Sequence, residues 1–465
     1  MLGAGPSGLG AALQLAKRKR FDVTVIERAG TVGGNAGSFE LDGIAVDFGS
    51  HRLHPACSPQ ILADIKSMLG SDLLVRPRHG RIRLRGRWIH FPLKPLDLLR
   101  SLPPSFAAGV AVDSVAKLRM RPPREEETFA SVLERGLGAT ICRDFYFPYA
   151  RKIWGVDASE LDAEQARRRV AAGSIGRMLR KVAGAVPGLK PKGQGTFFYP
   201  KKGYGQISHA YERSAIAEGA RVVLNSRVHG VELSGGRVVG ARVSDASGER
   251  SIESGQILST IPLPVLVQLF RPSAPADVLD GARSLAYRAM LLIYLVLDTD
   301  QFTEYDAHYF PEAAVAITRL SEPKNYGLIE CRGTTVLCAE WPCSQQDAVW
   351  SADESTLGSL VLQALDTAGL PVRSRVRRVE VRRLAQAYPI YTRNYQRNFD
   401  RLDDYLRGVD GLVTFGRQGL FAHDNTHHTL AMAYAASECV ADDGRFDRER
   451  WNLHRKAFES HVVED

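Results

Sequence analysis

The sequence is poor in the features that mark several classes of protein. It has only six cysteines in 465 residues, and no two of them show the C-x-x-C spacing of metal sites and thiol redox centres. No apolar run reaches the roughly 18 residues of a membrane-spanning helix, and the glycine-rich start differs from a secretory signal peptide. We therefore expect no membrane span, no metal site and reduced cysteines in a cytoplasmic protein.

Basic runs with interleaved aromatic residues are also missing, which argues against a nucleic-acid partner. The net charge of +9 and the pI near 9.2 indicate an anionic small-molecule ligand or, equally, arginines on solvated faces. A hydrophobic content of 44% and a charged content of 24% are typical of a globular protein. The length predicts two interleaved domains, and it is compatible with a homodimer.

The first residues match the dinucleotide-binding pattern G-x-G-x-x-G. The motif consists of Gly3, Gly5, Pro6, Ser7 and Gly8. Its glycines permit a tight turn, close approach of the backbone to a pyrophosphate, and packing of the helix on the strand. A helical run from Leu9 to about Lys19 follows. An apolar strand then ends at Glu27, about 20 residues after the last glycine, where a carboxylate can bind a ribose hydroxyl. These signals together favour a dinucleotide site over an ordinary turn.

The motif needs a buried strand before it, but only Met1 and Leu2 precede Gly3. Either upstream residues are absent from this chain, or its start is misassigned, or another segment fills the central strand position. We favour a missing N-terminal piece. We expect a chain with about five more apolar residues there to hold its cofactor better.

A second glycine-rich segment follows Glu27, with Arg28, Gly33, Gly34 and Asn35. It resembles the extended flavin fingerprint of the FAD-dependent family that contains amine oxidases, protoporphyrinogen oxidases, phytoene desaturases and UDP-galactopyranose mutases. The resemblance implies FAD as the cofactor, with these four residues along its diphosphate and ribityl chain.

A G-x-H-x-x-H pattern comes after a predicted hairpin that turns at Asp42-Gly43. It consists of Gly49, Ser50, His51 and His54. It resembles the segment that passes the flavin ring in the mutases, where the first histidine lies against the isoalloxazine. The resemblance implies that residues 49–51 contact the flavin, and it makes His51 and His54 catalytic candidates. A hydrogen-bonded structural imidazole is the alternative for each.

Residues 145–155 hold a cluster of aromatic side chains that includes Tyr149 and Trp154. The segment resembles the PY-x-x-K-x-WG element of the mutases and their oxidase relatives, so it predicts either a substrate wall or a hydrophobic core. Arg167-Arg168-Arg169 follows on a predicted helix, and an arginine in this neighbourhood of the mutases grips the substrate diphosphate. Which of the three faces inward is left open.

Three later residues are further substrate candidates by the same resemblance. They are Arg319, Tyr388 and Tyr391. For Arg319, a salt bridge within a sheet is the alternative.

The last part of the chain contains further cofactor candidates. They are Val228, whose backbone would meet the adenine edge, Gly416 and Arg417, which match the family's GR pair, and Asn425 and Thr426. A helix from about 429 to 440 would point its N-terminus at the flavin. His423, His427 and His428 could mimic a metal site, but we favour flavin contact or helix capping for them.

The resemblance runs from residue 3 to about 441 and implies an α/β fold. A GR2-type Rossmann-like FAD-binding domain would comprise residues 1–80, 200–265 and 386–445. An inserted α+β substrate domain would comprise residues 81–199 and 266–385, and residues 446–465 would form a C-terminal tail.

The leading hypothesis is an FAD-dependent oxidoreductase that transfers a hydride from an anionic small molecule to flavin N5. The alternative is a UDP-galactopyranose mutase-like enzyme that isomerises a nucleotide sugar through a flavin N5 adduct. A non-catalytic flavin-binding protein is disfavoured, because aromatic residues and histidines line the predicted pocket.

Overall fold

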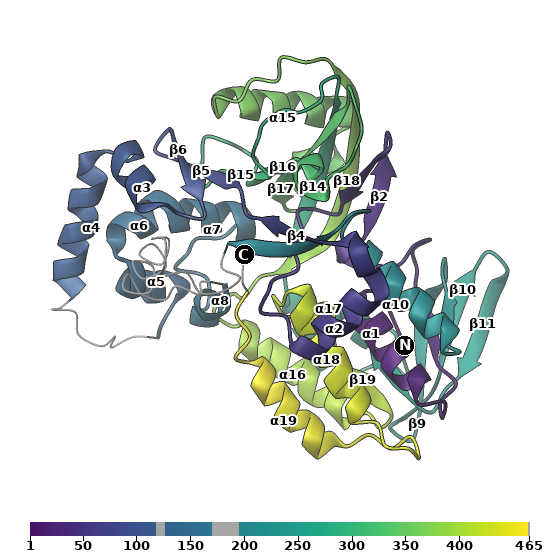
Figure 1. Ribbon diagram of the computed structural model, residues 1–465. Coiled ribbons are helices and arrows are strands. Elements are labelled where there is room, and N and C mark those ends of the chain that lie inside the picture. Colours follow the sequence, from purple (N-terminus) through teal and green to yellow (C-terminus); the bar gives the residue numbers. More distant parts are fainter. Residues whose placement is uncertain (118–125, 170–194, 464–465) are drawn as a thin grey trace.

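The computed structural model describes residues 1–117, 126–169 and 195–463 (Figure 1). Residues 118–125 and 170–194, which belong to the predicted substrate domain, lie outside the described residues. A large sheet occupies the upper half of the view in Figure 1, a group of helices lies beside it, and the two glycine-rich segments lie in the lower half. Within the described ranges, no helix is both long and apolar enough to cross a bilayer.

A parallel sheet forms the centre of the lower half. Its strands are β1 (Thr24–Ile26), β8 (Arg221–Val223), β12 (Ile257–Ser259) and β19 (Leu412–Thr414). β1 pairs with β8 and β12 pairs with β19, and Leu2 joins the two pairs by parallel bridges to Ile26 and Ser259. The Leu2 N–H donates to the carbonyl of Leu258, and its carbonyl accepts from the Thr260 N–H, both at 2.9 Å. The predicted α/β sheet is thus confirmed, and Leu2 fills its central position.

Helices cover this sheet and close its core. They are α1 (Pro6–Lys17), α2 (Pro59–Leu69), α10 (Gln206–Ala217), α18 (Thr426–Glu438) and α19 (Arg448–Phe458). α1 and α18 cross at Gly10, where an added Cβ would lie 2.9 Å from Leu430 and 3.2 Å from Ala433. Trp451 and Phe458 of α19 are buried in the same core, so the predicted C-terminal tail packs on this half of the protein.

Smaller sheets and helices surround the parallel sheet. The two-stranded sheets are the hairpin β2 (Ser38–Leu41) and β3 (Ile44–Asp47) and the pair β4 (Leu73–Pro77) and β7 (Thr196–Pro200). A third sheet consists of the antiparallel strands β9 (Arg227–Ser234), β10 (Arg237–Asp245) and β11 (Gly248–Glu253) with β13 (Phe270–Arg271). The helices are α11 (Leu263–Gln268), α12 (Ala276–Ser284), α16 (Tyr395–Gly408) and α17 (Gly416–Gly419), with the single turns η1 (Gly34–Ala36) and η2 (Gly70–Asp72). The β2–β3 turn is at Asp42-Gly43, as predicted, and both residues have positive φ.

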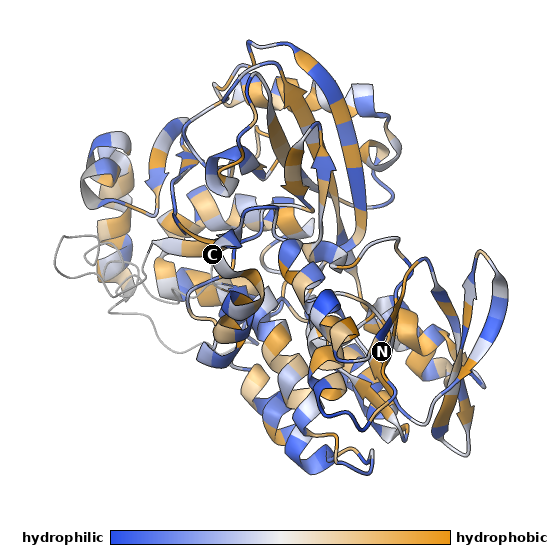
Figure 2. Ribbon diagram, turned by 45° about the vertical axis from the view of Figure 1, so that its right-hand side comes forward, coloured by the Kyte–Doolittle hydropathy of each residue, from blue (hydrophilic) through white to orange (hydrophobic). Residues whose placement is uncertain are grey.

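The upper half is built on a mixed sheet in the order β18-β14-β17-β16-β15-β5-β6. Its strands are β5 (Gly80–Leu84), β6 (Arg87–Phe91), β14 (Tyr287–Leu297), β15 (Ala307–Tyr309), β16 (Arg319–Ser321), β17 (Thr335–Cys343) and β18 (Val376–Pro389). Leu291 and Ile293 of β14 face a core covered by α15 (Glu354–Thr367), while Leu292 and Tyr294 face the β2–β3 hairpin. The edge strand β18 instead mixes hydrophilic and hydrophobic residues along its length (Figure 2).

Short helices form the layer beside this sheet. They are α3 (Pro95–Ser101), α4 (Pro104–Lys117), α5 (Phe129–Leu137), α6 (Ala139–Ile141), the π-helical turn η3 (Cys142–Tyr146), α7 (Phe147–Trp154) and α8 (Ala163–Arg169), with α13 (Pro323–Gly327) and α14 (Ala348–Ser351) elsewhere on the sheet. The sequence also predicts a helix break at Pro103-Pro104 and one helix over 127–149 with Thr128 as its cap. The break and the cap are confirmed. The single helix is wrong, because Gly138 adopts a φ of +90° and ends α5 there.

The carboxylate of Asp47 ties separate parts of the chain together. It accepts hydrogen bonds from the hydroxyls of Ser38 (2.6 Å) and Tyr199 (2.7 Å) and from the N–H of Tyr204 (2.8 Å). Its own carbonyl accepts from the Tyr294 hydroxyl of the large sheet at 2.6 Å. Burial raises the pKa of Asp47 to about 6, and the three hydrogen bonds oppose that rise.

We expect Asp47 to make the stability of the protein depend on pH. The folded state holds the Asp47 proton up to a higher pH than the unfolded chain, so the free energy of unfolding should rise as the pH falls from about 6 toward about 4. The gain should be on the order of 2–3 kcal/mol. Asp47→Asn should remove this component, as measured by urea unfolding at several pH values. The exposed Asp366→Asn should retain it, and identical profiles for all three proteins would contradict the assignment.

Candidate functional site

The two glycine-rich segments of the sequence lie against each other. Gly33, with a φ of +110°, donates its N–H to the carbonyl of Ala4 at 2.8 Å. A Cβ added to Gly34 would lie 3.8 Å from the Cα of Gly5. Gly8 is held more tightly, because a Cβ there would lie 2.0 Å from the carbonyl oxygen of Gly3. The backbone of these segments forms a cradle in front of α1.

Glu27 fixes the motif loop from the end of β1. One carboxylate oxygen accepts the N–H of Ala4 and the other accepts the N–H of Ala29, both at 2.9 Å. Each oxygen keeps a second lone pair, so the carboxylate can also accept a hydroxyl donor.

Two further segments reach the cradle from the parallel sheet. A Cβ on Gly3 would lie 2.7 Å from Thr260 Oγ1, and a Cβ on Gly416 would lie 2.6 Å from Ser7 Oγ. Thr260 follows β12 and Gly416 follows β19, so both come from the carboxyl ends of parallel strands. Ligands of open parallel sheets bind at these ends.

His51 lies at the edge of this region with its ring stacked on Tyr204, at a centroid distance of 5.3 Å. Its Nε2 is 2.8 Å from the carbonyl of Asn35 and 2.9 Å from that of Phe48. Both partners are acceptors, so Nε2 carries the proton and Nδ1 is left as an acceptor. Burial lowers the pKa of His51 to about 4, which keeps the ring neutral at neutral pH.

The N-terminus of α18 lies near His51. The helix begins at Thr426, earlier than the predicted start near 429, and Asn425 is its N-cap. The Thr426 side chain hydrogen-bonds Tyr204, whose ring stacks on His51. α18 therefore directs the positive end of its dipole toward the region that His51 borders.

The predicted histidine group is kept only in part, because the ring centroids of His427 and His428 lie 4.0 Å apart while His423 has a different partner. His428 Nδ1 accepts the Asn425 N–H at 3.3 Å, which is the capping role that the sequence favoured. His54 accepts the Ala56 N–H at 3.1 Å, and its ring stacks on His427 at 6.2 Å. His423 instead hydrogen-bonds Gln165. The catalytic roles of His51 and His54 stay predictions.

The comparisons with known proteins agree with this cradle. The family described as flavin containing amine oxidoreductase matches residues 6–441. The chain belongs to this family. FAD, predicted from the fingerprint, is the cofactor of this flavin-containing family member.

The proteins that the chain resembles carry names of different enzymes. The chloroplast protoporphyrinogen oxidase of Oryza sativa subsp. japonica is 27% identical over 304 residues, which cover 60% of this chain and 55% of that protein. The chain thus spans little more than half of that relative. A crystal structure of reduced UDP-galactopyranose mutase matches with a TM-score of 0.81 at 20% identity, covering 100% of this chain and 99% of that one. Putrescine oxidase bound to putrescine matches with a TM-score of 0.64 at 16% identity, covering 94% and 97%. At these identities the structural matches show a common fold.

The residues of the cradle fit FAD. A Cβ on Gly5 would meet no protein atom within 4 Å, so open space lies at the N-terminus of α1. That terminus has no side-chain cap, which leaves backbone N–H donors for a diphosphate. Glu27 beside it suits a ribose hydroxyl. Arg28 is exposed after β1, and Val228 on β9 pairs with Val243. Their contacts with FAD stay predictions.

Asn35 and Arg417 both donate hydrogen bonds to backbone carbonyls of β18. Asn35 Nδ2 donates to the carbonyl of Gln386 at 3.2 Å, and Gln418 Nε2 donates to the same carbonyl at 2.9 Å. Arg417 donates to the carbonyls of Ala387 at 3.1 Å and Asp424 at 3.3 Å. Segments from the beginning and the end of the chain thus converge on the end of β18.

The Gly49-Ser50 turn is attached to the large sheet through Glu340. The Ser50 N–H donates to Glu340 Oε1 at 2.8 Å, and a Cβ on Gly49 would lie 3.3 Å from the same oxygen. Arg319 binds both oxygens of Glu340, at 2.9 and 2.8 Å. We therefore revise the prediction for Arg319: its guanidinium is occupied by the salt bridge that was the alternative, because Glu340 is buried and needs a counter-charge.

Of the predicted substrate residues, Tyr391 also needs revision. It is 2% exposed, its hydroxyl donates to the carbonyl of Phe421 at 2.7 Å, and its ring stacks on Tyr395 at 4.0 Å. It is a core residue, since its polar and apolar parts are both satisfied by the protein. Trp154 is buried against Phe129 at 5.4 Å.

A cavity of about 310 Å³ between α16, β19 and α19 is lined by none of the predicted site residues.

Tyr149 and Tyr388 are partly buried in the aromatic cluster that contains Trp154.

One of the three consecutive arginines faces this aromatic cluster. Arg167 pairs with Glu127 at 2.5 Å, and Arg168 pairs with Glu164 at 2.7 Å. The Arg169 guanidinium lies over the rings of Tyr388 at 5.3 Å and Trp154 at 6.0 Å. Arg417 also lies over Tyr388, at 5.3 Å. Among the described residues, no carboxylate pairs with Arg169.

Several residues that shape the site were not among the predicted site residues. They are Asp47, Thr260, Glu340 and Tyr204. Thr260 had a signal, since it directly follows β12 at the carboxyl end of the parallel sheet. Asp47 and Glu340 had no comparable signal, because most of their partners are distant in the sequence.

We expect Gly5→Ala to fold and yet lose FAD. Gly5 has an ordinary φ of −73° and no protein neighbour around its added Cβ, but that methyl group would occupy the space at the helix terminus. FAD affinity should fall at least tenfold, about 1.4 kcal/mol, in a fluorescence titration of stripped protein. Gly255→Ala, which also meets no neighbour, is the matched control. Equal FAD affinity in both variants would remove Gly5 from the cofactor site.

Proposed function

We propose that the chain is an FAD-dependent oxidoreductase that acts on an anionic small molecule. The family membership and the cradle built by residues 3–8, 33–34 and 416 support the flavin part of this proposal. FAD bound there supplies the redox chemistry by accepting a hydride at N5. We also keep the domain boundaries predicted from the sequence as a proposal, with substrate held by residues 81–199 and 266–385, and a homodimer as the assembly.

The guanidinium of Arg169, which has no carboxylate partner among the described residues, is the observation that supports an anionic substrate. Its two neighbours in sequence have carboxylate partners, whereas Arg169 lies over Tyr388 and Trp154 with none among the described residues. A planar guanidinium binds a carboxylate or a phosphate through two parallel hydrogen bonds. Arg417, over the same tyrosine, adds positive charge to this wall.

The other residues of the site position and shield the reacting groups. Tyr388 and Trp154 present aromatic rings that exclude water and attract the Arg169 guanidinium. His51 is neutral at neutral pH and donates Nε2–H to two backbone carbonyls. It therefore acts as a hydrogen-bond acceptor through Nδ1 rather than as a general acid.

A mutase-like activity on a nucleotide sugar is the second candidate. Arg169 follows the PY-x-x-K-x-WG element and faces its tryptophan, in the neighbourhood where the mutases hold the substrate diphosphate. Two phosphates would match the paired charges of Arg169 and Arg417.

Turnover stoichiometry separates the two functions. FAD-loaded protein is mixed with amines, porphyrinogens and UDP-galactose, and oxygen or acceptor consumption is measured beside product formation. An oxidoreductase consumes one acceptor for each product. A mutase forms product with only catalytic reductant and consumes no acceptor, which would overturn the first proposal. Spectral silence of the loaded protein toward every compound would overturn both.

We expect Arg169→Met to weaken substrate binding specifically. With the compound that turns over, KM should rise at least tenfold while kcat changes by less than about threefold, since the guanidinium binds the substrate charge away from the reacting bond. Arg167→Met, which removes an exposed surface pair, should leave both constants unchanged. A KM equal to that of the unmodified protein would exclude Arg169 from the substrate site.

A further inference from the structure

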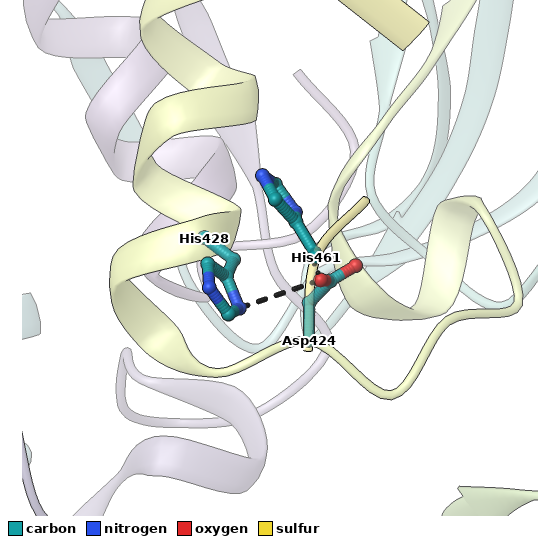
Figure 3. Close-up of side chains that lie close together, drawn as sticks. All are labelled: Asp424, His428 and His461. Carbon is teal, nitrogen blue, oxygen red and sulfur yellow. Dashed lines mark hydrogen bonds and ion pairs between the residues drawn. The ribbon is translucent and has the colours of Figure 1, made fainter. Parts of the chain in front are cut away.

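Asp424, His428 and His461 bring three metal-ligand side chains together at the start of α18 (Figure 3). Their ligand atoms all lie within 4.8 Å of one another. Asp424 Oδ1 is 3.0 Å from His461 Nδ1 and 3.5 Å from His428 Nδ1. The group is new relative to the sequence pattern, because His461 lies outside the matched family region and replaces His423 and His427 of the predicted trio.

The separations match those around a small divalent cation. Metal–ligand bonds of about 2.0–2.1 Å in tetrahedral geometry put neighbouring ligand atoms about 3.3–3.4 Å apart. The two distances to Asp424 Oδ1 bracket this value. Two imidazoles and one carboxylate are a ligand set that zinc and related divalent ions accept.

Asp424 is the group that most needs a cation. Its side chain is 4% exposed, and its Oδ2 is buried without a hydrogen-bond partner in the described part of the chain. A buried carboxylate with an unsatisfied oxygen is costly unless a charge or a donor compensates it. Arg417, the nearby arginine, donates to the backbone carbonyl of Asp424 instead.

We propose that Asp424, His428 and His461 bind one divalent cation of the zinc class, with a fourth position open to water. The rings of His428 and His461 are stacked at 4.2 Å and 14°, so one ring must turn for both nitrogens to face a single ion. His461 is the ring that can turn, because it follows α19 on a non-helical segment, whereas His428 is fixed within α18. Binding replaces the His428 bond to the Asn425 N–H.

The ion would fasten the C-terminal segment to the site. His461 follows α19, which is anchored by Trp451 and Phe458, and the Val463 N–H donates to the carbonyl of Arg168 at 2.8 Å. Arg168 precedes the substrate candidate Arg169 on α8. A metal at His461 thus links the end of α19 to α18 and holds it against α8.

The test measures zinc on FAD-loaded protein stripped with chelator. Dialysis against about 10 μM zinc chloride, followed by elemental analysis, should leave one zinc ion per chain. His461→Ala and Asp424→Asn should each weaken binding at least tenfold. His454→Ala, a histidine of the same α19 outside the trio, should bind zinc as the unmodified protein does. The FAD absorbance of each variant shows whether it is folded.

X-ray absorption at the zinc edge keeps the proposal falsifiable if a variant fails to fold. The unmodified protein should show an inner shell of nitrogen and oxygen only, with imidazole scattering. Sulfur in that shell would place the ion on cysteines and overturn the proposal. So would the absence of stoichiometric zinc, or binding that survives His461→Ala.

Discussion

The buried carboxylate of Asp47 is the constraint on which the arrangement of the two halves depends. A charge in the interior must be met by donors, and its donors come from β2, from β7 and from the turn before α10. The carbonyl of the same residue receives the Tyr294 hydroxyl from the large sheet. One residue therefore connects the β2–β3 hairpin, the end of β7, the turn before α10 and the large sheet.

Glu340 is a second buried carboxylate that connects separate parts of the chain. It lies buried in β17 and forms a salt bridge with Arg319. One of its oxygens also accepts the N–H of Ser50, next to His51. Removing one member of such a buried pair leaves an uncompensated charge, which costs far more than the pair contributes. The Gly49-Ser50 turn, which the sequence predicts to face the flavin, is thus held by groups of the large sheet. The position of His51 depends on the contact between the two halves as much as on its own segment.

The arginines that give the sequence its positive charge also differ in their partners. Many arginines of the described chain pair with carboxylates, as Arg167 and Arg168 do, and the exposed ones among these pairs contribute little to stability. The Arg169 guanidinium has no carboxylate partner among the described residues and lies over aromatic rings instead. The net charge alone could not separate these two uses. The position of each guanidinium in the fold separates them and supports an anionic substrate for this flavin-dependent family member.

The sequence by itself determined the local parts: the glycine motif, the strand ending at Glu27, the Asp42-Gly43 hairpin and the Thr128 cap. These follow from short-range sterics and hydrogen bonds, which neighbouring residues encode. It also indicated the family and its cofactor, because several such segments recur in a fixed order. Only the tertiary structure decided that Arg319 pairs with Glu340, that Tyr391 is core, that Arg169 faces the aromatic wall, and that His461 joins Asp424 and His428. Each of those outcomes depends on partners far apart in the chain, and nothing in the local sequence records the distance between them.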